Sequence, residues 1–149
     1  NPTTKTMTGR LKHCLNAFVV DVIDDNSYTA ITYAAEKTNA IVNDYTAAPV
    51  YFTENSNGAH EWLIEFEKEP DDFNTFITEL DNELKNINSD YEAKRYKNIA
   101  LRLPVVHALS TVTFNKWLRS KGMLGGQHKV PRLSNERTML EEILAINNK

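Results

Sequence analysis

Two adjacent stretches in the middle of the chain have the clearest strand patterns. Residues 41–53 (IVNDYTAAPVYFT) are rich in β-branched and aromatic side chains, and residues 59–68 (AHEWLIEFEK) follow the turn-forming sequence ENSNG at 54–58. This arrangement predicts a β-hairpin. In the second arm, aromatic and aliphatic residues alternate with mostly acidic ones, which predicts one buried and one solvated face. Pro49 has no amide donor, so we expect it at a sheet edge or a bulge.

The segment that follows has the clearest helical period. Pro70, Asp71 and Asp72 precede it and provide a helix start. Its apolar residues recur at offsets of three or four positions and are Phe73, Phe76, Ile77, Leu80, Leu84 and Ile87. This spacing predicts a helix with one packed face and one solvated, acidic face. The sequence Asn88-Ser89-Asp90 should break this helix and cap a short charged one at residues 91–98.

The segments on either side of this central region predict two further strands and a helix. Residues 15–23 (LNAFVVDVI) contain strand-forming side chains, and the acidic and amide residues at 24–26 can cap a helix over 27–37. Residues 99–109 (IALRLPVVHAL) predict a third long strand, with a bulge at Pro104.

The last third of the chain predicts two more helices. The first is capped by Thr111 or Thr113 and ends at Gly122, where we expect a left-handed backbone. The second is capped by Ser134 and Asn135. Their inward-facing residues are Phe114, Trp117 and Leu118, and then Met139, Leu140, Ile143 and Leu144. The order β, α, β, β, α, β, α, α predicts an α+β fold, a small mostly antiparallel sheet with helices packed on it.

Length and composition narrow the class of protein. The chain has 149 residues, of which 41% are hydrophobic, which suits one domain with a substantial core. The single cysteine, Cys14, excludes an internal disulfide framework and a zinc site built on several thiolates. The sequence contains no run of about 18 apolar residues and no signal-peptide pattern, so we expect a cytoplasmic protein without membrane contact. The Thr-rich start suggests a piece of a longer polypeptide.

Charge is distributed unevenly along the chain. Residues 54–92 contain twelve acidic residues against Lys68 and Lys85, whereas residues 116–137 contain six basic residues against Glu136 alone. The simpler interpretation is that both blocks are solvated faces. The alternative is that the basic block attracts an anion. Because the formal net charge is −3, we do not expect nucleic acid as a partner.

One loop carries candidate chemistry. It contains Gly125, Gly126, Gln127, His128, Lys129 and Arg132. Glycines let backbone amides approach an anion and a lysine adds a mobile positive charge, so such a loop can hold a phosphate, although a Gly-Gly pair after a helix can also be a simple C-terminal cap. Neither a GxxxxGK[ST] nor a GxGxxG sequence is present. The four histidines are scattered without a catalytic spacing, and no complete active site is visible in the sequence.

Four segments resemble the GH3 acyl acid amido synthetases, the plant auxin-conjugating branch of the adenylate-forming enzymes, and in particular their bacterial members. They are TGRLKH at 8–13, GAHEWLIEFEKEPDD at 58–72, NSDYEAKR at 88–95 and LGGQHKVPRLSN at 124–135. The last is similar to a Gln-Tyr-Lys-x-Pro-Arg loop in which His128 replaces the tyrosine. Val19 and Val20 stand where relatives commonly carry a glycine and acidic residues, so residues that contact the acceptor are left unassigned.

The resemblance implies the small C-terminal lid domain of a two-domain synthetase. Residues 1–12 would then be the hinge or linker from an N-terminal adenylation domain, with Gly9, Arg10 and Lys12 as hinge residues, and residues 13–149 the C-terminal domain. Lys129 would be the catalytic residue that bridges the acid carboxylate and the ATP phosphate. Its loop neighbours Gly125, Gly126, Gln127, His128 and Arg132 would support the phosphate.

The same resemblance implies an activity and its cofactors. The complete enzyme would use ATP with Mg²⁺ to activate an acyl acid as acyl-AMP and pass it to an amine, for which we expect an amino acid. Its partner would be the N-terminal adenylation domain of the same polypeptide, and the isolated chain would be inactive and hold no cofactor. An alternative is a non-catalytic binding or regulatory module with the same fold, and a third possibility is a charged domain without anion affinity at Lys129.

Overall fold

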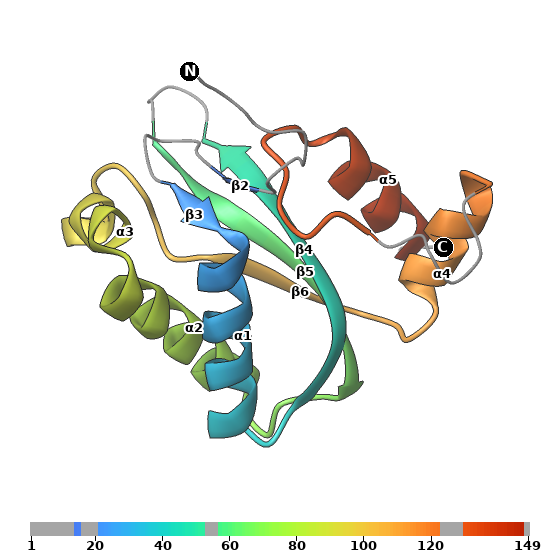
Figure 1. The fold of residues 1–149 in the computed structure, drawn as a ribbon, viewed down its shortest axis with the longest axis horizontal. Helices are drawn as coiled ribbons and strands as arrows, with labels where there is room; N and C mark the ends of the chain where they lie inside the picture. The colour runs from blue at the N-terminus through green and yellow to red at the C-terminus, as the bar shows by residue number, and fades with distance from the viewer. Residues whose placement is uncertain (1–13, 16–20, 53–56, 123–129, 148–149) are drawn as a thin grey trace.

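The computed structural model describes residues 14–15, 21–52, 57–122 and 130–147 of the chain (Figure 1). Among them are the strands β2 (Cys14–Leu15), β3 (Val22–Ile23), β4 (Ile41–Tyr51), β5 (Gly58–Lys68) and β6 (Val105–Leu109). The helices are α1 (Asp24–Lys37), α2 (Phe73–Ile87), α3 (Ser89–Arg95), α4 (Thr113–Ser120) and α5 (Thr138–Asn147), with a short 3₁₀ turn, η2 (Tyr96–Asn98), after α3. The α+β fold predicted from the sequence is confirmed.

The central sheet has three strands in the order β4, β5, β6. β4 and β5 form the predicted antiparallel hairpin, with Pro49 opposite His60, whereas β6 pairs with β5 in parallel, with His107 opposite Leu63. The sheet is therefore mixed. Pro49 lies in β4, which is an edge strand of this sheet as predicted, and the register shifts of β4 occur nearer its start, around Val42.

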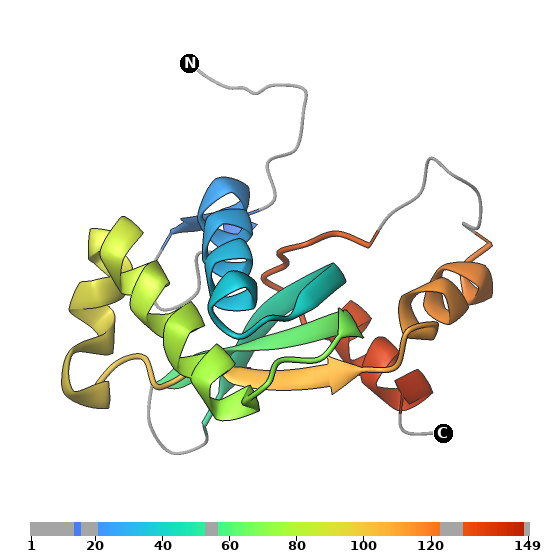
Figure 2. The same cartoon turned by 90° about the horizontal axis from the view of Figure 1, so that it is seen from below.

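Helices cover both faces of this sheet. α1 and α2 lie side by side on one face, while α5 lies against the opposite face near α4 (Figure 2). The first face is packed through a cluster that includes Tyr45, Trp62, Ile64, Phe76 and Leu80. The amphipathic pattern of α2 supplies the helical side of that cluster, as the sequence predicts.

The second face corrects one prediction. The acidic side of β5 is not solvated, because Glu61 and Glu65 are both buried on it together with Leu63. A second cluster covers them, built from Ala48, Leu63, Leu109, Phe114, Trp117, Leu118, Val130, Leu140 and Ile143. Only Glu67, near the end of the strand, is exposed as expected. The strand is therefore buried on both faces, and its buried carboxylates bond to other groups of the protein.

The third strand is shorter than predicted and has no bulge. β6 begins at Val105, directly after Pro104, and the chain before it is not part of the strand but forms an isolated bridge between Leu101 and Gly58. Pro104 has no N–H for a ladder and restricts the residue before it, so the strand begins beyond it. The predicted strand over 15–23 is likewise divided into β2 and β3, which pair antiparallel. Residues 16–20 between them lie outside the described residues.

The helix boundaries show which capping predictions hold. Asp72 caps α2 by accepting a hydrogen bond from the Thr75 amide, and Asn88 caps α3 by accepting one from the Tyr91 amide. Gly122 after α4 has φ +71°, the predicted left-handed conformation.

Three other helix starts differ from the prediction. α1 begins at Asp24, and the Asn26 side chain accepts from the Ile23 amide. The N-cap position of α4 is occupied by Val112, whose side chain cannot accept a hydrogen bond, and Ser110 and Thr113 bond each other through their hydroxyls. α5 begins at Thr138, so Ser134 instead forms a local turn with Glu136.

A buried ion pair joins α2 to α3. Asp81 lies on the helix face predicted to be solvated, yet it is buried and accepts hydrogen bonds from Tyr91 at 2.6 Å and from Arg95 at 2.7 and 2.8 Å. Burial by itself raises the pKa of the Asp81 carboxyl, but these hydrogen bonds outweigh burial and hold the pKa below its usual value of 3.8. Arg95 also donates to the carbonyl oxygen of Leu101 at 3.1 Å and so ties α3 to the chain leading into β6.

Candidate functional site

The predicted site residues fall mostly outside the described part of the chain. Gly9, Arg10 and Lys12 of the predicted hinge lie outside the described residues, as do Gly125, Gly126, Gln127, His128 and Lys129 of the predicted loop. The exception is Arg132, at the end of that loop. The structure therefore describes the residues that follow the predicted hinge and the predicted loop.

After the loop, the chain is anchored along the outer edge of β4. The Ala47 amide donates to the Arg132 carbonyl oxygen at 2.9 Å, and the Ser134 amide donates to the Ala47 carbonyl oxygen at 3.0 Å. Leu133 forms a parallel bridge with Ala47. The Thr46 hydroxyl adds a 2.6 Å hydrogen bond to the carbonyl oxygen of Pro131. We call residues 130–134 the anchored segment.

Side chains of the anchored segment enter both hydrophobic clusters. Val130 is buried in the cluster beneath α4 and α5, and Leu133 is buried in the cluster beneath α1 and α2. Leu15 of β2, three positions after the predicted hinge residue Lys12, is fully buried in the same cluster as Leu133. The chain leaving the predicted hinge and the chain leaving the predicted loop are thus fixed in one core.

The side chain of Arg132 lies on aromatic rings. Its guanidinium carbon is 4.9 Å from the ring centre of Tyr45 and 5.9 Å from that of Tyr28. Its Nε is 3.6 Å from the Oδ1 of Asp44, which itself accepts a 2.9 Å hydrogen bond from the Tyr45 amide. Arg132 keeps 38% of its side chain exposed. Its assignment to phosphate support stays a prediction.

Tyr45 forms a rigid platform for this arginine. The ring is 2% exposed, its centre is 6.0 Å from that of Trp62, and its hydroxyl forms a 2.8 Å hydrogen bond with the buried Ser27 of α1. Burial raises the pKa of the Tyr45 hydroxyl, so the group is neutral at physiological pH.

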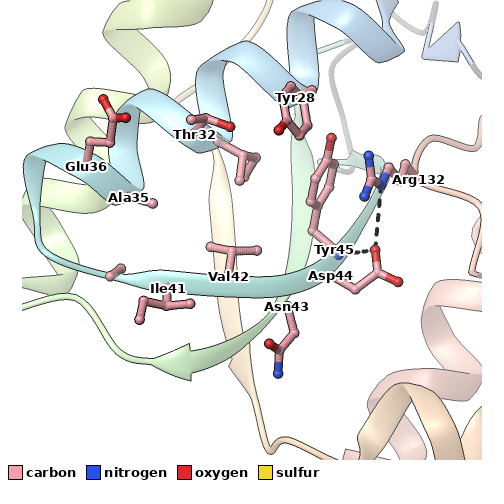
Figure 3. Close-up of a pocket in the computed structure, with 12 residues that line it drawn as sticks. Tyr28, Thr32, Ala35, Glu36, Ile41, Val42, Asn43, Asp44, Tyr45 and Arg132 are labelled. Carbon is pink, nitrogen blue, oxygen red and sulfur yellow. Dashed lines mark hydrogen bonds and ion pairs between the residues drawn. The ribbon is translucent and has the colours of Figure 1, made fainter.

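Arg132 closes one end of a cleft between α1 and the first half of β4 (Figure 3). The cleft has a volume of about 280 Å³. Ile31, Ala35 and Val42 contribute apolar side chains to its lining, and Glu36 lines it on α1, two helical turns beyond Tyr28. Sequence reasoning missed this site, because its parts are separated by about 90 positions and only tertiary contact brings Arg132 to the first strand of the hairpin.

The histidines interpreted as core or face residues have those positions. His60 is 1% exposed beside the Tyr91 ring, and burial lowers the pKa of its imidazole to about 4. His107 Nε2 lies 2.6 Å from Glu61, whose other oxygen accepts a 2.8 Å hydrogen bond from Arg137. Within the described ranges there is no cluster of three or more His, Cys, Asp or Glu side chains able to hold a metal ion. None of the helices described is both long and apolar enough to cross a membrane.

The fold and the anchored segment together define a class, an α+β domain whose mixed three-stranded sheet is covered by helices on both faces. A comparison with protein families identifies it further: residues 25–138 match the family described as "GH3 family C-terminal domain". This match covers most of the chain, which therefore belongs to the GH3 family as a C-terminal domain. No curated protein sequence is significantly similar to the chain.

Solved structures have the same fold. The chain is similar to a "GH3.15 acyl acid amido synthetase", with a TM-score of 0.69 and 20% identity over 94% of this chain. It is also similar to "AtGH3.15 acyl acid amido synthetase in complex with 2,4-DB", with a TM-score of 0.71 and 18% identity over 93% of this chain. The chain spans only 25% and 26% of those two proteins.

Proposed function

We propose that the chain acts as the C-terminal domain of an ATP-dependent synthetase, which forms an acyl-adenylate from a carboxylic acid and conjugates the acyl group to an amine, with an amino acid as the expected acceptor. The family match over residues 25–138 is the observation that carries this proposal. The names of the structural relatives, acyl acid amido synthetases, agree with it.

In this proposal Lys129 acts in the first half-reaction. The acid carboxylate attacks the α-phosphorus of ATP, and negative charge grows on the oxygens between them while pyrophosphate leaves. A lysine ammonium placed beside these oxygens stabilises the transition state. Lys129 directly precedes Val130 in the sequence, and Val130 begins the anchored segment, which is hydrogen-bonded to the edge of β4.

The N-terminal adenylation domain would supply the remaining contacts in this proposal. It would bind ATP, Mg²⁺ and the acyl acid, and the hinge at Gly9, Arg10 and Lys12 would let the C-terminal domain rotate between adenylation and transfer. The described residues do not fit a magnesium site, because they contain no cluster of three metal-ligating side chains.

The test compares two lysines of the basic block in the polypeptide that joins this chain to an adenylation domain. Lys129→Ala should slow acid-dependent exchange of pyrophosphate into ATP by about 10²–10³-fold, because one preorganised contact to developing charge is lost. Lys116→Ala, on the exposed face of α4, is the matched control and should leave the exchange rate within about twofold, as expected for a surface site.

Transfer from preformed acyl-adenylate separates the two half-reactions. It should remain near the unmodified rate in Lys129→Ala, because the lysine acts before the anhydride is complete. Equal slowing of both half-reactions would contradict the role of Lys129. Absence of any acid-dependent exchange in the unmodified polypeptide would favour the alternative, a non-catalytic binding or regulatory module.

A further inference from the structure

We infer that the cleft between α1 and β4 is a binding site for a small monocarboxylate with an apolar body, its carboxylate on Arg132 and its body over Ile31, Ala35 and Val42. This site is on the C-terminal domain itself, needs neither ATP nor a second domain, and gives Arg132 a carboxylate ligand in place of the phosphate predicted from the sequence. It would bind its ligand whether or not the chain takes part in adenylation.

Arg132 offers unused hydrogen-bond donors to such a ligand. Its Nε to Asp44 distance of 3.6 Å is an ion pair and too long for a hydrogen bond, and the described residues form no hydrogen bond to its guanidinium. A guanidinium carries five N–H donors in a planar fork that matches a carboxylate in two parallel hydrogen bonds. With 38% of the side chain exposed, the fork remains accessible from solvent.

The fork is also held in place before a ligand arrives. The Arg132 backbone is fixed by the hydrogen bond to Ala47, and its guanidinium lies 4.9 Å from the buried ring of Tyr45, whose hydroxyl is bonded to Ser27. Little side-chain freedom is lost when such a group binds an anion, so affinity gains from the preorganisation.

The rest of the cleft matches an apolar body better than a second charge. Ile31, Ala35 and Val42 contribute apolar side chains to the lining, and Tyr28 and Ile41 at the rim are 57% and 48% exposed, although both are large hydrophobic residues. Tyr28 and Glu36 are eight positions apart on α1, so the cleft extends over about 12 Å. A small ring or a short chain fits this length and the volume of about 280 Å³.

Charge selects the kind of anion. Among the described residues that line the cleft, Arg132 is basic and Glu36 and Asp44 are acidic, and Asp44 is already ion-paired with Arg132. The one guanidinium can balance the single charge of a monocarboxylate but not both charges of a dianionic phosphate, and the second charge would be repelled by Glu36 and Asp44. The carboxylates thus discriminate against phosphate while the apolar lining favours an organic acid.

The experiment is a titration of the 149-residue chain followed by amide and methyl NMR shifts. Benzoate should produce saturable shifts confined to α1, the first half of β4 and the anchored segment. Benzamide, which has the same ring without the charge, should bind at least about tenfold more weakly, and inorganic phosphate should not compete with benzoate.

Two arginines provide the matched pair of variants. Arg132→Gln keeps part of the side chain over Tyr45 but removes the fork, and should weaken benzoate binding by about tenfold or more. Arg102→Gln removes an arginine that lies over the Phe52 ring, at 5.5 Å, outside the cleft, and should leave binding unchanged. Thr32→Trp, which fills the cleft from α1 with Arg132 intact, should also abolish binding.

Four results would overturn the inference. They are the absence of saturable shifts with benzoate, an equal response to benzamide, full competition by phosphate, and equal binding by the Arg132→Gln and Arg102→Gln chains. Because the titration contains no ATP and no second domain, its outcome does not depend on the proposed synthetase activity. Conversely, loss of pyrophosphate exchange in Lys129→Ala leaves this inference untouched.

Discussion

Thr46 and Pro131 are 85 positions apart in the sequence, and the Thr46 hydroxyl donates a 2.6 Å hydrogen bond to the Pro131 carbonyl oxygen. Thr46 is fully buried, so on folding its hydroxyl loses its hydrogen bonds to water and forms this one instead. Together with the two backbone hydrogen bonds of Ala47, this contact holds the chain that follows the predicted loop against the edge of β4.

Thr46→Val tests the strength of that attachment. Valine has nearly the shape of threonine, so the substitution removes the hydrogen bond and leaves the Pro131 carbonyl without the Thr46 hydroxyl. The free energy of unfolding should fall by about 1 kcal/mol in chemical denaturation. Thr32→Val, at a partly exposed position on α1, is the control and should change it by no more than about 0.5 kcal/mol. Equal effects of the two substitutions would show that the Thr46 contact contributes nothing specific.

Arg95→Met tests the buried ion pair between α2 and α3. The Asp81 carboxylate would stay buried after losing two of its hydrogen bonds, which should cost about 3–5 kcal/mol of unfolding free energy. Arg102→Met, at an exposed position over Phe52, should cost less than about 1 kcal/mol.

The pKa of Asp81 gives this pair a pH dependence. Because the folded-state pKa lies below the usual 3.8, its stabilisation is present above about pH 4 and is lost as the pH falls through the folded value. Asp81→Asn should remove this part of the acid sensitivity. Acid unfolding curves that are parallel for Asp81→Asn and the unmodified chain would contradict the assignment.

Glu65 should have the opposite pH dependence. Burial raises the pKa of its carboxyl, partly offset by hydrogen bonds from the Phe114 amide and the Asn43 side chain, so the folded state favours the protonated form. Its contribution is therefore favourable below the usual pKa of 4.5 and is lost as the pH rises through the folded value.

The effect of Glu65→Gln on the unfolding free energy should therefore depend on pH. The substitution should be more stabilising, or less destabilising, at pH 7 than at pH 4. Denaturation at the two pH values measures the difference. Glu67→Gln, at an exposed position of the same strand, should change stability by less than about 0.5 kcal/mol. A Glu65→Gln effect that is the same at both pH values would refute the direction given for the Glu65 pKa.

Phe76→Ala tests whether the chain forms its own core. Phe76 is fully buried and packs edge to face on Phe66, with ring centres 5.3 Å apart, so its removal should cost about 3–5 kcal/mol. Ile77→Ala, at a half-buried position beside it, should cost clearly less. We expect the unmodified 149-residue chain to melt cooperatively. A broad melt with strong dye binding from the start would mean that the core is incomplete without another domain.

Lys12→Pro tests the predicted hinge in the polypeptide that contains an adenylation domain. Proline fixes φ near −65° and removes an N–H, so the domain should keep one orientation and lose the other. One half-reaction should survive while the other is lost. Thr4→Pro, in the predicted linker but before the hinge residues Gly9, Arg10 and Lys12, is the control. If Lys12→Pro left both half-reactions at the unmodified rate, the hinge assignment and the rotating-lid interpretation would have to be abandoned.

The hairpin and α2 could be predicted because local patterns determine them. A period of two over residues 59–68 identifies the strand and one of its two buried faces, and a period near 3.6 over residues 73–87 identifies the packed face of the helix, without any knowledge of partners. The caps Asp72 and Asn88 are also local, since each bonds an amide three residues ahead.

The features that escaped prediction depend on distant parts of the chain. Glu61 is buried because His107 and Arg137 pair with its carboxylate, 46 and 76 positions away. β6 begins at Val105 and runs parallel to β5, which a local pattern cannot reveal. The cleft at Arg132 likewise required contact between the end of a loop and the first hairpin strand.

The two-sided burial of β5 has a consequence for biosynthesis. Most of the residues that cover its second face come from α4, the anchored segment and α5, all of which lie after residue 109 and therefore leave the ribosome well after β5. Until then, Leu63 and its apolar neighbours stand on an uncovered sheet that is able to pair with other nascent chains. A frameshift or premature stop near the end of this region would thus produce an aggregating polypeptide rather than a shortened, working one.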